Sequence, residues 1–278
     1  MLSVIIPAYN EEKTLAEVID RVLALPLRPE VIVVDDGSRD GTADIIRRFQ
    51  RERGIVGVIC PVNGGKGAAI AAGLKFATQP YTIIQDADLE YYPEEYESLL
   101  EPVRRGRAEV VYGSRNLRTP AALKNHFHYL RFWLGGKVVT LVANLLYGVH
   151  LTDEATCYKL FPTELLRRMN LQCRGFDFCP EVTGKALRLG WRIHEVPIRY
   201  NPRSMAEGKK IRARHGIEAI LVLMKYRFMP LAGLLAANRG LKPARRKAVS
   251  MVPRGVKTTG PPARSAGGNA LAGARVTA

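Results

Sequence analysis

Asp86 and Asp88 are separated by one residue, and they follow a short segment that ends in Ile83, Ile84 and Gln85. Carboxylates spaced in this way at the end of a strand can reach one hard cation. Mg²⁺ and Mn²⁺ prefer one or two carboxylates together with water and phosphate oxygens. A metal held there would neutralise the charge that grows on a leaving diphosphate. The alternative is structural, since both residues could cap the next helix.

Two further apolar segments end in polar residues that a protein core does not require. Residues 31–34 run into the sequence DDGS at residues 35–38, and residues 110–112 run into GSR at residues 113–115. Gly37 and Gly41 permit a tight turn after the first of these segments. All three polar ends follow segments that look like strands.

The first 115 residues alternate between two patterns. Short apolar runs rich in β-branched residues are separated by segments whose apolar residues recur at helical spacing. The predicted strands are residues 2–7, 31–34, 55–59, 81–84 and 109–112, and the predicted helices are residues 11–25, 42–49, 66–77 and 93–105. This alternation predicts an α/β fold with a mostly parallel sheet covered by helices on both faces. Such sheets bind ligands at the carboxyl ends of their strands.

The pattern changes after residue 115. Helices are predicted at residues 131–149, 160–169, 180–189 and 217–235, a strand at residues 192–200, and a polar loop at residues 201–210. From residue 240 onward Pro, Gly, Ala, Ser and Arg dominate, which is typical of disorder. We therefore expect one catalytic domain at residues 1–239, with halves at 1–115 and 116–239, followed by a disordered basic tail at 240–278.

The positive charge of the chain is unevenly placed. The formal net charge is +16, and +8 of it lies in residues 240–278, which hold eight Lys and Arg and no Asp or Glu. This balance favours anionic partners such as phosphates, nucleic acid or an acidic membrane surface. No nucleic-acid-binding motif accompanies the charge, so no specific nucleic acid is expected.

The cysteines and the N-terminus indicate a cytoplasmic protein. Cys60, Cys157, Cys173 and Cys179 show no CxxC spacing, and reduced thiols are the better interpretation. The N-terminus lacks the basic region and the cleavage site of a signal peptide. No run reaches about 18 uninterrupted apolar residues, so no transmembrane helix is expected.

Five motifs in order resemble family 2 glycosyltransferases of the GT-A fold. They are VIIPAYNE at residues 4–11, VVDDGS at 33–38, GGKG at 64–67, DAD at 86–88 and GSR at 113–115. The resemblance covers nearly everything before the tail. It implies a Rossmann-like GT-A domain that transfers a sugar with inversion from a nucleotide-diphosphate sugar, using Mg²⁺ or Mn²⁺.

The resemblance also implies roles for single residues. The nucleotide sugar would contact Pro7, Ala8, Tyr9, Glu11, Asp36, Lys66, Asp86, Ala87, Arg203 and Lys209. Within that set, Asp36 would lie near the base and Asp86 near the ribose and the metal, while Asp88 would ligate the metal. Lys66 begins a helix whose N-terminus would face the nucleotide. The loop that carries Arg203 and Lys209 could close over the donor.

Segments of the second half resemble dolichyl- or polyprenyl-phosphate sugar transferases. They are residues 147–153, 156–161, 175–183, 195–200, 207–211 and 223–228. The resemblance implies a polyprenyl monophosphate as the acceptor. Relatives often carry Glu directly before the TCYK sequence, but this chain has Ala155 there, with Glu154 beside it.

The chemistry of such an acceptor suits the basic composition. A lipid monophosphate is already an anion and needs no strong general base, whereas cations must limit the repulsion between two phosphates. Candidates for binding the acceptor phosphate are Arg115, Arg131 and Lys210, since Arg can clamp phosphate through two hydrogen bonds. A solvated basic surface is the alternative for each. Asp88, Arg115 and Asp153 are the candidate catalytic residues, with Asp153 a base only if the acceptor is a hydroxyl.

Two apolar segments interrupted by charge, residues 131–149 and 217–235, indicate contact with a membrane surface. Together with the basic tail they predict a peripheral enzyme at the inner face of the membrane. The alternative is a core helix followed by a solvated tail.

Other functions remain to be weighed. A saccharide hydroxyl could replace the lipid phosphate as acceptor. A dehydrogenase would need GxGxxG after the first strand, and a P-loop would need GxxxxGK[ST], and neither pattern is present. A non-catalytic binder could act through its basic tail alone, with binding that falls steeply in salt. The sugar, the base, the lipid length and the oligomeric state have no signature in the sequence.

Overall fold

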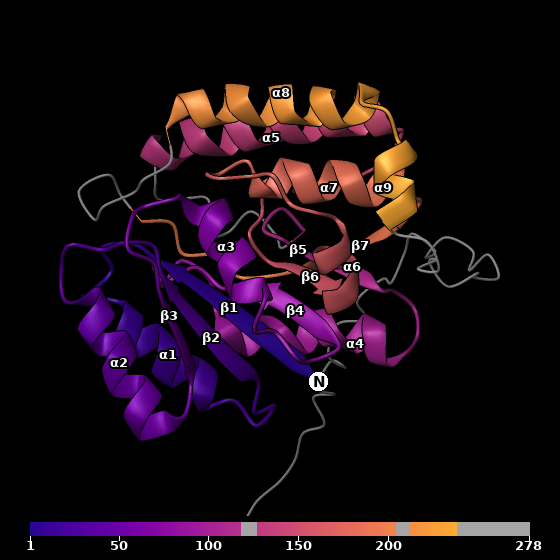
Figure 1. Cartoon of the computed structure of the whole chain (residues 1–278). Coiled ribbons are helices and arrows are strands. Elements are labelled where there is room, and N and C mark those ends of the chain that lie inside the picture. The colour runs from indigo at the N-terminus through magenta and orange to yellow at the C-terminus, as the bar shows by residue number, and fades with distance from the viewer. Residues whose placement is uncertain (118–126, 204–211, 238–278) are drawn as a thin grey trace, which may run out of the picture. The chain divides into compact units, whose positions relative to one another are not determined.

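The computed structural model describes residues 1–117, 127–203 and 212–237. The chain divides into units Met1–Ala244 and Arg245–Ala278, and the described residues all belong to the first. Their main feature is a seven-stranded sheet with the strand order β3-β2-β1-β4-β6-β5-β7 (Figure 1). The tail predicted at residues 240–278 lies outside the described residues.

The sheet is mixed but mostly parallel. Its strands are β1 (Leu2–Ala8), β2 (Glu30–Asp35), β3 (Val56–Ile59), β4 (Tyr81–Ile84), β5 (Val110–Ser114), β6 (Lys159–Pro162) and β7 (Ile193–Pro197). Only β6 runs against both of its neighbours, β4 and β5. The central register pairs Val4 with Val31 on one side and with Ile83 on the other. The carboxyl ends of β1, β2 and β4 therefore meet at one edge, which confirms the predicted α/β class.

Both faces of the sheet are covered, because the strands are apolar on both sides. On β1, Val4 and Ile6 pack with α1 (Leu15–Leu23), α2 (Thr42–Arg53) and α4 (Tyr96–Arg104). Ile5 points to the other face, where the core includes residues of α3 (Lys66–Leu74), α6 (Thr163–Arg168) and α7 (Phe178–Arg188). A short 3₁₀ helix, η1 (Pro93–Glu95), precedes α4.

Two longer helices form an outer layer beside α7, at the top of Figure 1. They are α5 (Phe127–Tyr147) and α8 (Ala213–Phe228), and they share a small core of Val139, Ala143 and Leu223. The Tyr147 hydroxyl donates to the Leu223 carbonyl at 2.7 Å. In the part of the chain that the structure describes, no helix is both long and apolar enough to cross a membrane.

Two predicted helices were wrong in their extent. The helix expected at residues 160–169 begins only at Thr163, because Leu160 and Phe161 are buried in β6 and pair with its neighbours. The helix expected at residues 217–235 breaks after Phe228, and α9 (Ala232–Ala237) follows. Pro162 and Pro230 lie at these boundaries, since proline lacks the N–H that a helix interior needs.

Candidate active site

A cavity of about 630 Å³ opens where the carboxyl ends of β1, β2 and β4 meet. Most of the residues predicted from the sequence line it: Pro7, Ala8, Tyr9, Glu11, Asp36, Lys66, Asp86, Ala87, Asp88, Arg115 and Arg203. Asp153 is not among the lining residues but contacts Arg115 behind the wall. The backbone of Arg131 lies in α5, while Lys209 and Lys210 fall outside the described residues.

Asp86 and Lys66 form an ion pair inside the cavity. Lys66 is the first residue of α3, and its ammonium donates to Asp86 Oδ1 and to the Cys157 Sγ, at 3.0 Å from the sulfur. Burial alone would raise the pKa of Asp86, but the Lys66 charge, the hydrogen bonds from Cys157 and Lys66 and the Arg203 charge together outweigh it, and the pKa is lowered. Burial would likewise lower the pKa of Lys66, whereas Asp86 holds it well above its usual value. Both groups are therefore charged at neutral pH.

Asp88 is held by a different cation. Arg203 Nη2 lies 3.1 Å from Asp88 Oδ2, and Arg203 Nη1 lies 3.2 Å from Glu11 Oε2. The other oxygen of Asp88 accepts a hydrogen bond from the Glu90 N–H at 3.1 Å. Burial and the charges of Asp86 and Glu90 raise the pKa of Asp88 to about 7, although Arg203 acts against them. Negative charge is thus in excess at this point.

This excess of carboxylate fits a divalent cation. Mg²⁺ and Mn²⁺ take one or two carboxylates and complete their ligand set with water and substrate phosphate oxygens. Asp86 and Asp88 supply two carboxylates at one end of the cavity. Within residues 1–117, 127–203 and 212–237, no group of three or more His, Cys, Asp or Glu side chains is placed to hold a metal. Two carboxylates would leave the other ligand positions of such a metal to water and to the phosphate oxygens of a substrate.

Asp36 fixes the turn that begins α3. Its two carboxylate oxygens accept hydrogen bonds from the N–H groups of Gly64 and Gly65, each at 2.8 Å. Gly65 has a φ of +89°, and a Cβ on it would lie 2.2 Å from the Arg174 carbonyl oxygen. Only glycine fits there, because the turn packs directly against the backbone of Arg174. Asn63, which the sequence analysis missed, adds a hydrogen bond to the Asp36 carbonyl at 3.2 Å.

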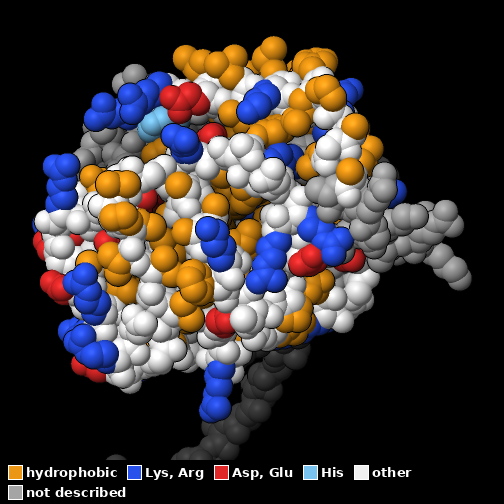
Figure 2. All heavy atoms as spheres, in the orientation of Figure 1, with side chains coloured by type: hydrophobic (Ala, Val, Ile, Leu, Met, Phe, Trp, Pro, Cys, Tyr) orange, Lys and Arg blue, Asp and Glu red, His pale blue; other side chains and the backbone are white. Residues whose placement is uncertain are grey.

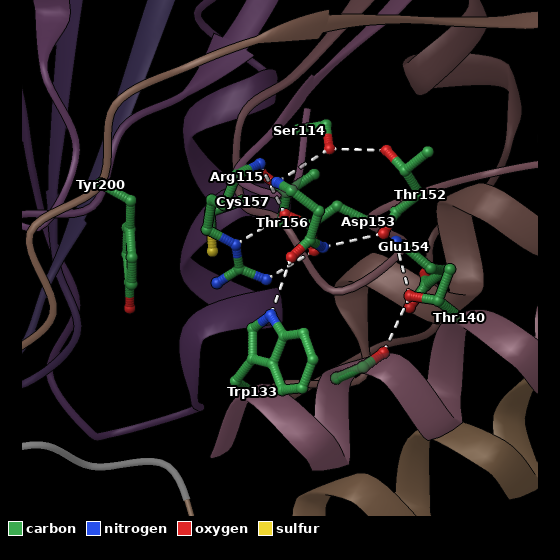
Figure 3. A network of polar contacts seen from close by, with 12 residues as sticks. Ser114, Arg115, Trp133, Thr140, Thr152, Asp153, Glu154, Thr156, Cys157 and Tyr200 are labelled. Carbon is green, nitrogen blue, oxygen red and sulfur yellow. Dashed lines mark hydrogen bonds and ion pairs between the residues drawn. The ribbon is translucent and has the colours of Figure 1, made fainter. Parts of the chain in front are cut away.

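Arg115 is positioned by Asp153 (Figure 3). Asp153 Oδ1 lies 2.7 Å from Arg115 Nη2, and its Oδ2 accepts from Arg115 Nε at 2.7 Å and from the Arg115 N–H at 2.9 Å. Asp153 is only 1% exposed. Burial would lower the pKa of Arg115, but Asp153 holds it well above its usual value. The guanidinium lies 5.0 Å from the centre of the Tyr200 ring at the cavity wall.

Ala155 and Glu154 point to different surroundings. Ala155 lines the cavity, whereas Glu154 is fully buried with its Oε1 4.0 Å from the Lys159 ammonium. Burial raises the pKa of Glu154, although Lys159 opposes this. Glu154 therefore does not face the cavity, and the methyl group of Ala155 lines it instead.

The start of α8 adds three cavity residues that the sequence analysis missed, Arg212, Arg214 and His215. The His215 ring lies 4.7 Å from the ring of Phe176, another lining residue. Burial lowers the pKa of His215, as do Arg214 and Arg212, against the effect of Glu218. The sequence feature that could have identified these residues is the basic sequence RARH at residues 212–215. The helix was predicted to begin only at residue 217, so RARH was left outside it. Arg212 and Arg214 therefore add positive charge to the cavity lining, and this part of it is here called the cationic wall.

Residues 3–169 match the family model described as glycosyl transferase family 2. The chain is 33% identical over 215 residues to an undecaprenyl-phosphate mannosyltransferase from Micrococcus luteus, which covers 74% of this chain and 85% of the relative. It is 32% identical over 216 residues to a polyprenol monophosphomannose synthase from Mycolicibacterium smegmatis. That match covers 74% of this chain and 79% of the relative.

Solved structures with the same fold include a glucosyl-3-phosphoglycerate synthase from Mycobacterium tuberculosis in complex with Mn²⁺, uridine diphosphate and phosphoglyceric acid. It matches with a TM-score of 0.60 and 22% identity over 83% of this chain and 79% of that chain. At this identity the similarity establishes the GT-A type of fold for the described domain.

Proposed function

The chain belongs to glycosyl transferase family 2, and we propose that it transfers a hexose from a UDP- or GDP-sugar to a polyprenyl monophosphate, with a divalent metal and with inversion. One observation carries this proposal. A single cavity is lined by the acidic pair Asp86 and Asp88, by Arg115, and by the cationic wall of Arg212 and Arg214. The acidic pair suits a metal diphosphate, and the cationic wall suits a second phosphate.

The donor is proposed to lie along the carboxyl ends of β1 and β2. Tyr9 and Asn63 line the cavity near the Asp36 turn and would flank the base, while Pro7 and Ala8 would contact the nucleoside. The N–H groups of Gly64 and Gly65 already donate to Asp36. From the start of α3 it is therefore the Lys66 ammonium that would face the phosphates. A metal on Asp86 and Asp88 would neutralise the leaving diphosphate. Arg203 would exchange its contact with Asp88 for the donor phosphates when that metal binds.

The acceptor is proposed to approach from the cationic wall. A phosphate oxygen of the lipid attacks the anomeric carbon, the bond to the diphosphate breaks, and its electron pair leaves with the nucleoside diphosphate. This single displacement inverts the anomeric centre and forms no covalent enzyme intermediate. Arg115 and the arginines of α8 would hold the two phosphates close despite their repulsion. Asp153 is proposed to position Arg115 through its two hydrogen-bonded oxygens, rather than to take a proton.

The remaining expectations belong to the same proposal. Residues 1–239 form the catalytic domain, and the basic tail at 240–278 follows it. Arg131, Lys209 and Lys210 add positive charge for the lipid phosphate and the donor. The enzyme acts at the inner face of the membrane, where nucleotide sugars and the phosphate group of the lipid meet. The 33% identity to an undecaprenyl-phosphate mannosyltransferase supports the choice of acceptor.

A transfer assay tests the proposal. UDP- and GDP-sugars with a labelled sugar are incubated with polyprenyl phosphate in detergent, with Mn²⁺, with Mg²⁺ or with a chelator. The expected result is a chloroform-soluble product that requires metal and disappears in Asp88→Ala. The matched control is Asp44→Ala, which removes an exposed aspartate on α2. If the donor binds but no lipid product forms, the lipid phosphate is the wrong acceptor and hydroxyl acceptors are tested next. If no nucleotide sugar binds, the proposal is refuted.

A further inference from the structure

Two cysteines that are far apart in the sequence lie next to one another at the wall of the cavity. Cys157 stands shortly before β6 and lines the cavity, and Cys179 is the second residue of α7. Cys179 Sγ lies 3.3 Å from the carbonyl oxygen of Thr156, the residue before Cys157. A hydrogen bond also joins the two thiols. The two residues are here called the Cys157–Cys179 pair.

The surroundings of the pair favour oxidation. The hydrogen bond with Cys157 lowers the pKa of Cys179. The charges of Lys159 and Lys66 act in the same direction, against burial and the charge of Glu154. A lowered pKa increases the fraction of thiolate, which is the form of cysteine that attacks an oxidant. Because Cys157 lines the cavity, a small oxidant that enters the cavity reaches the pair.

Cys157 is also connected to the proposed donor site. The Lys66 ammonium donates to Cys157 Sγ at 3.0 Å and to Asp86 Oδ1. The Cys157 N–H donates to the Tyr91 hydroxyl at 3.1 Å, which holds the backbone beside this contact. A disulfide has an S–S distance of about 2.0 Å, much shorter than a hydrogen bond between thiols. Its formation would therefore draw the Cys157 sulfur toward α7 and disturb its contact with Lys66.

We propose that a peroxide entering the cavity couples Cys157 and Cys179 into a disulfide, which weakens the binding of metal and nucleotide at Lys66 and Asp86. In the net reaction with hydrogen peroxide the O–O bond breaks and an S–S bond forms. The sulfurs together lose two electrons, and the two thiol hydrogens leave in two molecules of water. Thiol–disulfide exchange with a dithiol reductant reverses the reaction. The effect on binding rests on the proposed function, whereas formation of the disulfide does not.

The test treats the full-length chain with hydrogen peroxide, which is small and uncharged. The chain has a net charge of +16, and Figure 2 shows Lys and Arg side chains spread over the face that it draws. An anionic oxidant would gather on this charge and react elsewhere as well. After the peroxide is removed, free thiols are counted in denaturant and linked peptides are identified by mass spectrometry. Calorimetry with Mn²⁺ and UDP or GDP measures binding before and after oxidation.

Two single variants separate the pair from the other cysteines. Cys179→Ser removes one member of the pair, and Cys179 is not among the residues that line the cavity. Cys60→Ser is the matched control, because Cys60 is also partly exposed but directly follows β3. Burial and the charges of Asp36 and Asp35 raise the pKa of Cys60, which makes its thiol less reactive. Thermal unfolding checks that each variant is folded, and Cys179→Ala serves as a second replacement.

The wild type and Cys60→Ser are expected to lose two free thiols and to yield a peptide pair linked through Cys157 and Cys179. Both should then bind Mn²⁺ with nucleotide about tenfold more weakly until a dithiol reductant is added. Cys179→Ser should bind as the reduced wild type does before oxidation and form no linked pair.

A wild type without a linked pair, or a link that involves Cys60 or Cys173, would overturn the proposal. Unchanged binding in the linked protein would overturn its second part, the effect on the donor site. If the linked pair forms but neither the reduced nor the oxidised protein binds nucleotide, the proposed function fails and the disulfide stands.

Discussion

Arg203 Nη2 lies 3.1 Å from Asp88 Oδ2, so that a side chain of the second half of the domain neutralises the candidate metal ligand of the first half. The same guanidinium reaches Glu11 at 3.2 Å. A cation of the protein therefore lies beside the carboxylate to which a metal would bind. Metal binding and the position of Arg203 should depend on one another.

The pH dependence of metal binding follows from this contact. The pKa of Asp88 is raised to about 7, so the carboxyl is protonated below that pH and able to ligate above it. Binding of Mn²⁺ together with the nucleoside diphosphate should therefore strengthen as the pH rises through about 7. Arg203 lowers the pKa of Asp88, so Arg203→Gln should move this midpoint to higher pH. Electron paramagnetic resonance titrations of free Mn²⁺ measure it, with Asp88→Asn as the control that lacks the transition. An unchanged midpoint in Arg203→Gln would contradict the coupling.

Asp153 should act on the rate through Arg115. In Asp153→Asn the guanidinium loses a carboxylate that binds it at 2.7 Å through both oxygens, so it is less well oriented. We expect kcat to fall by about 10- to 100-fold with little change in donor affinity. The pH–rate profile should keep its shape, because no proton passes to Asp153. If the rate of Asp153→Asn no longer fell on one side of the pH–rate profile where the wild-type rate does, Asp153 would instead be identified as a base.

Gly65→Ala should damage the donor site more than an ordinary glycine substitution does. The new Cβ would combine a φ of +89° with an approach of 2.2 Å to the Arg174 carbonyl oxygen. Gly106→Ala is the matched control, since Gly106 has a φ of +62° but nothing within 4 Å of the added Cβ. The control should lose about 1 kcal/mol of unfolding free energy, and Gly65→Ala at least about 2 kcal/mol. Denaturant unfolding and calorimetry of nucleotide binding measure both effects, and equal losses would refute the role of the close approach.

Glu181 and Lys185 on α7 form a buried ion pair, and Glu181 also accepts from the Tyr226 hydroxyl of α8 at 2.8 Å. In Glu181→Gln the buried ammonium lacks its counter-charge, which should cost about 3 to 5 kcal/mol of unfolding free energy. Glu164→Gln breaks an ion pair of the same i,i+4 spacing with the exposed Arg168, and should cost about 0.5 kcal/mol or less.

The Glu181 contribution should also depend on pH. Burial would raise the pKa of Glu181, but Lys185 and its other hydrogen-bond partners lower it below the usual 4.5. The stabilisation is therefore complete above pH 4.5 and is lost as the pH falls through the lower, folded value. Unfolding free energies of the wild type and Glu181→Gln should converge in acid. A constant difference across that range would contradict the assignment.

The sheet was predictable because its strands are short, apolar on both sides and followed by polar residues. The antiparallel strand β6 was not predicted, since its apolar run of Leu160 and Phe161 could equally begin a helix. Pro162 held the missing signal, as Pro230 did for the break after α8. In both places the proline marks the boundary that periodicity alone could not locate.

The acidic side of the cavity was predictable from local sequence, because Asp86 and Asp88 lie just after the end of one strand, β4. The cationic side was predicted only in part, since it depends on how α8 packs beside α5 and α7. That packing brings Arg212 and Arg214 to residues more than 100 positions earlier in the chain. The pairing of Arg115 with Asp153 was likewise outside the reach of sequence spacing. Long-range contacts of this kind depend on the tertiary fold rather than on any local pattern.

The most direct test of the central claim compares two acceptors that differ only in the phosphate. Polyprenyl phosphate and the matching polyprenol are supplied in the same vesicles, with Mn²⁺ and the labelled nucleotide sugar that the donor panel identifies. We predict a lipid product from the phosphate alone, and none when a chelator removes the metal. Glycosylation of the polyprenol at a comparable rate would contradict the claim, because Arg115, Arg212 and Arg214 are proposed to bind an acceptor that is already an anion.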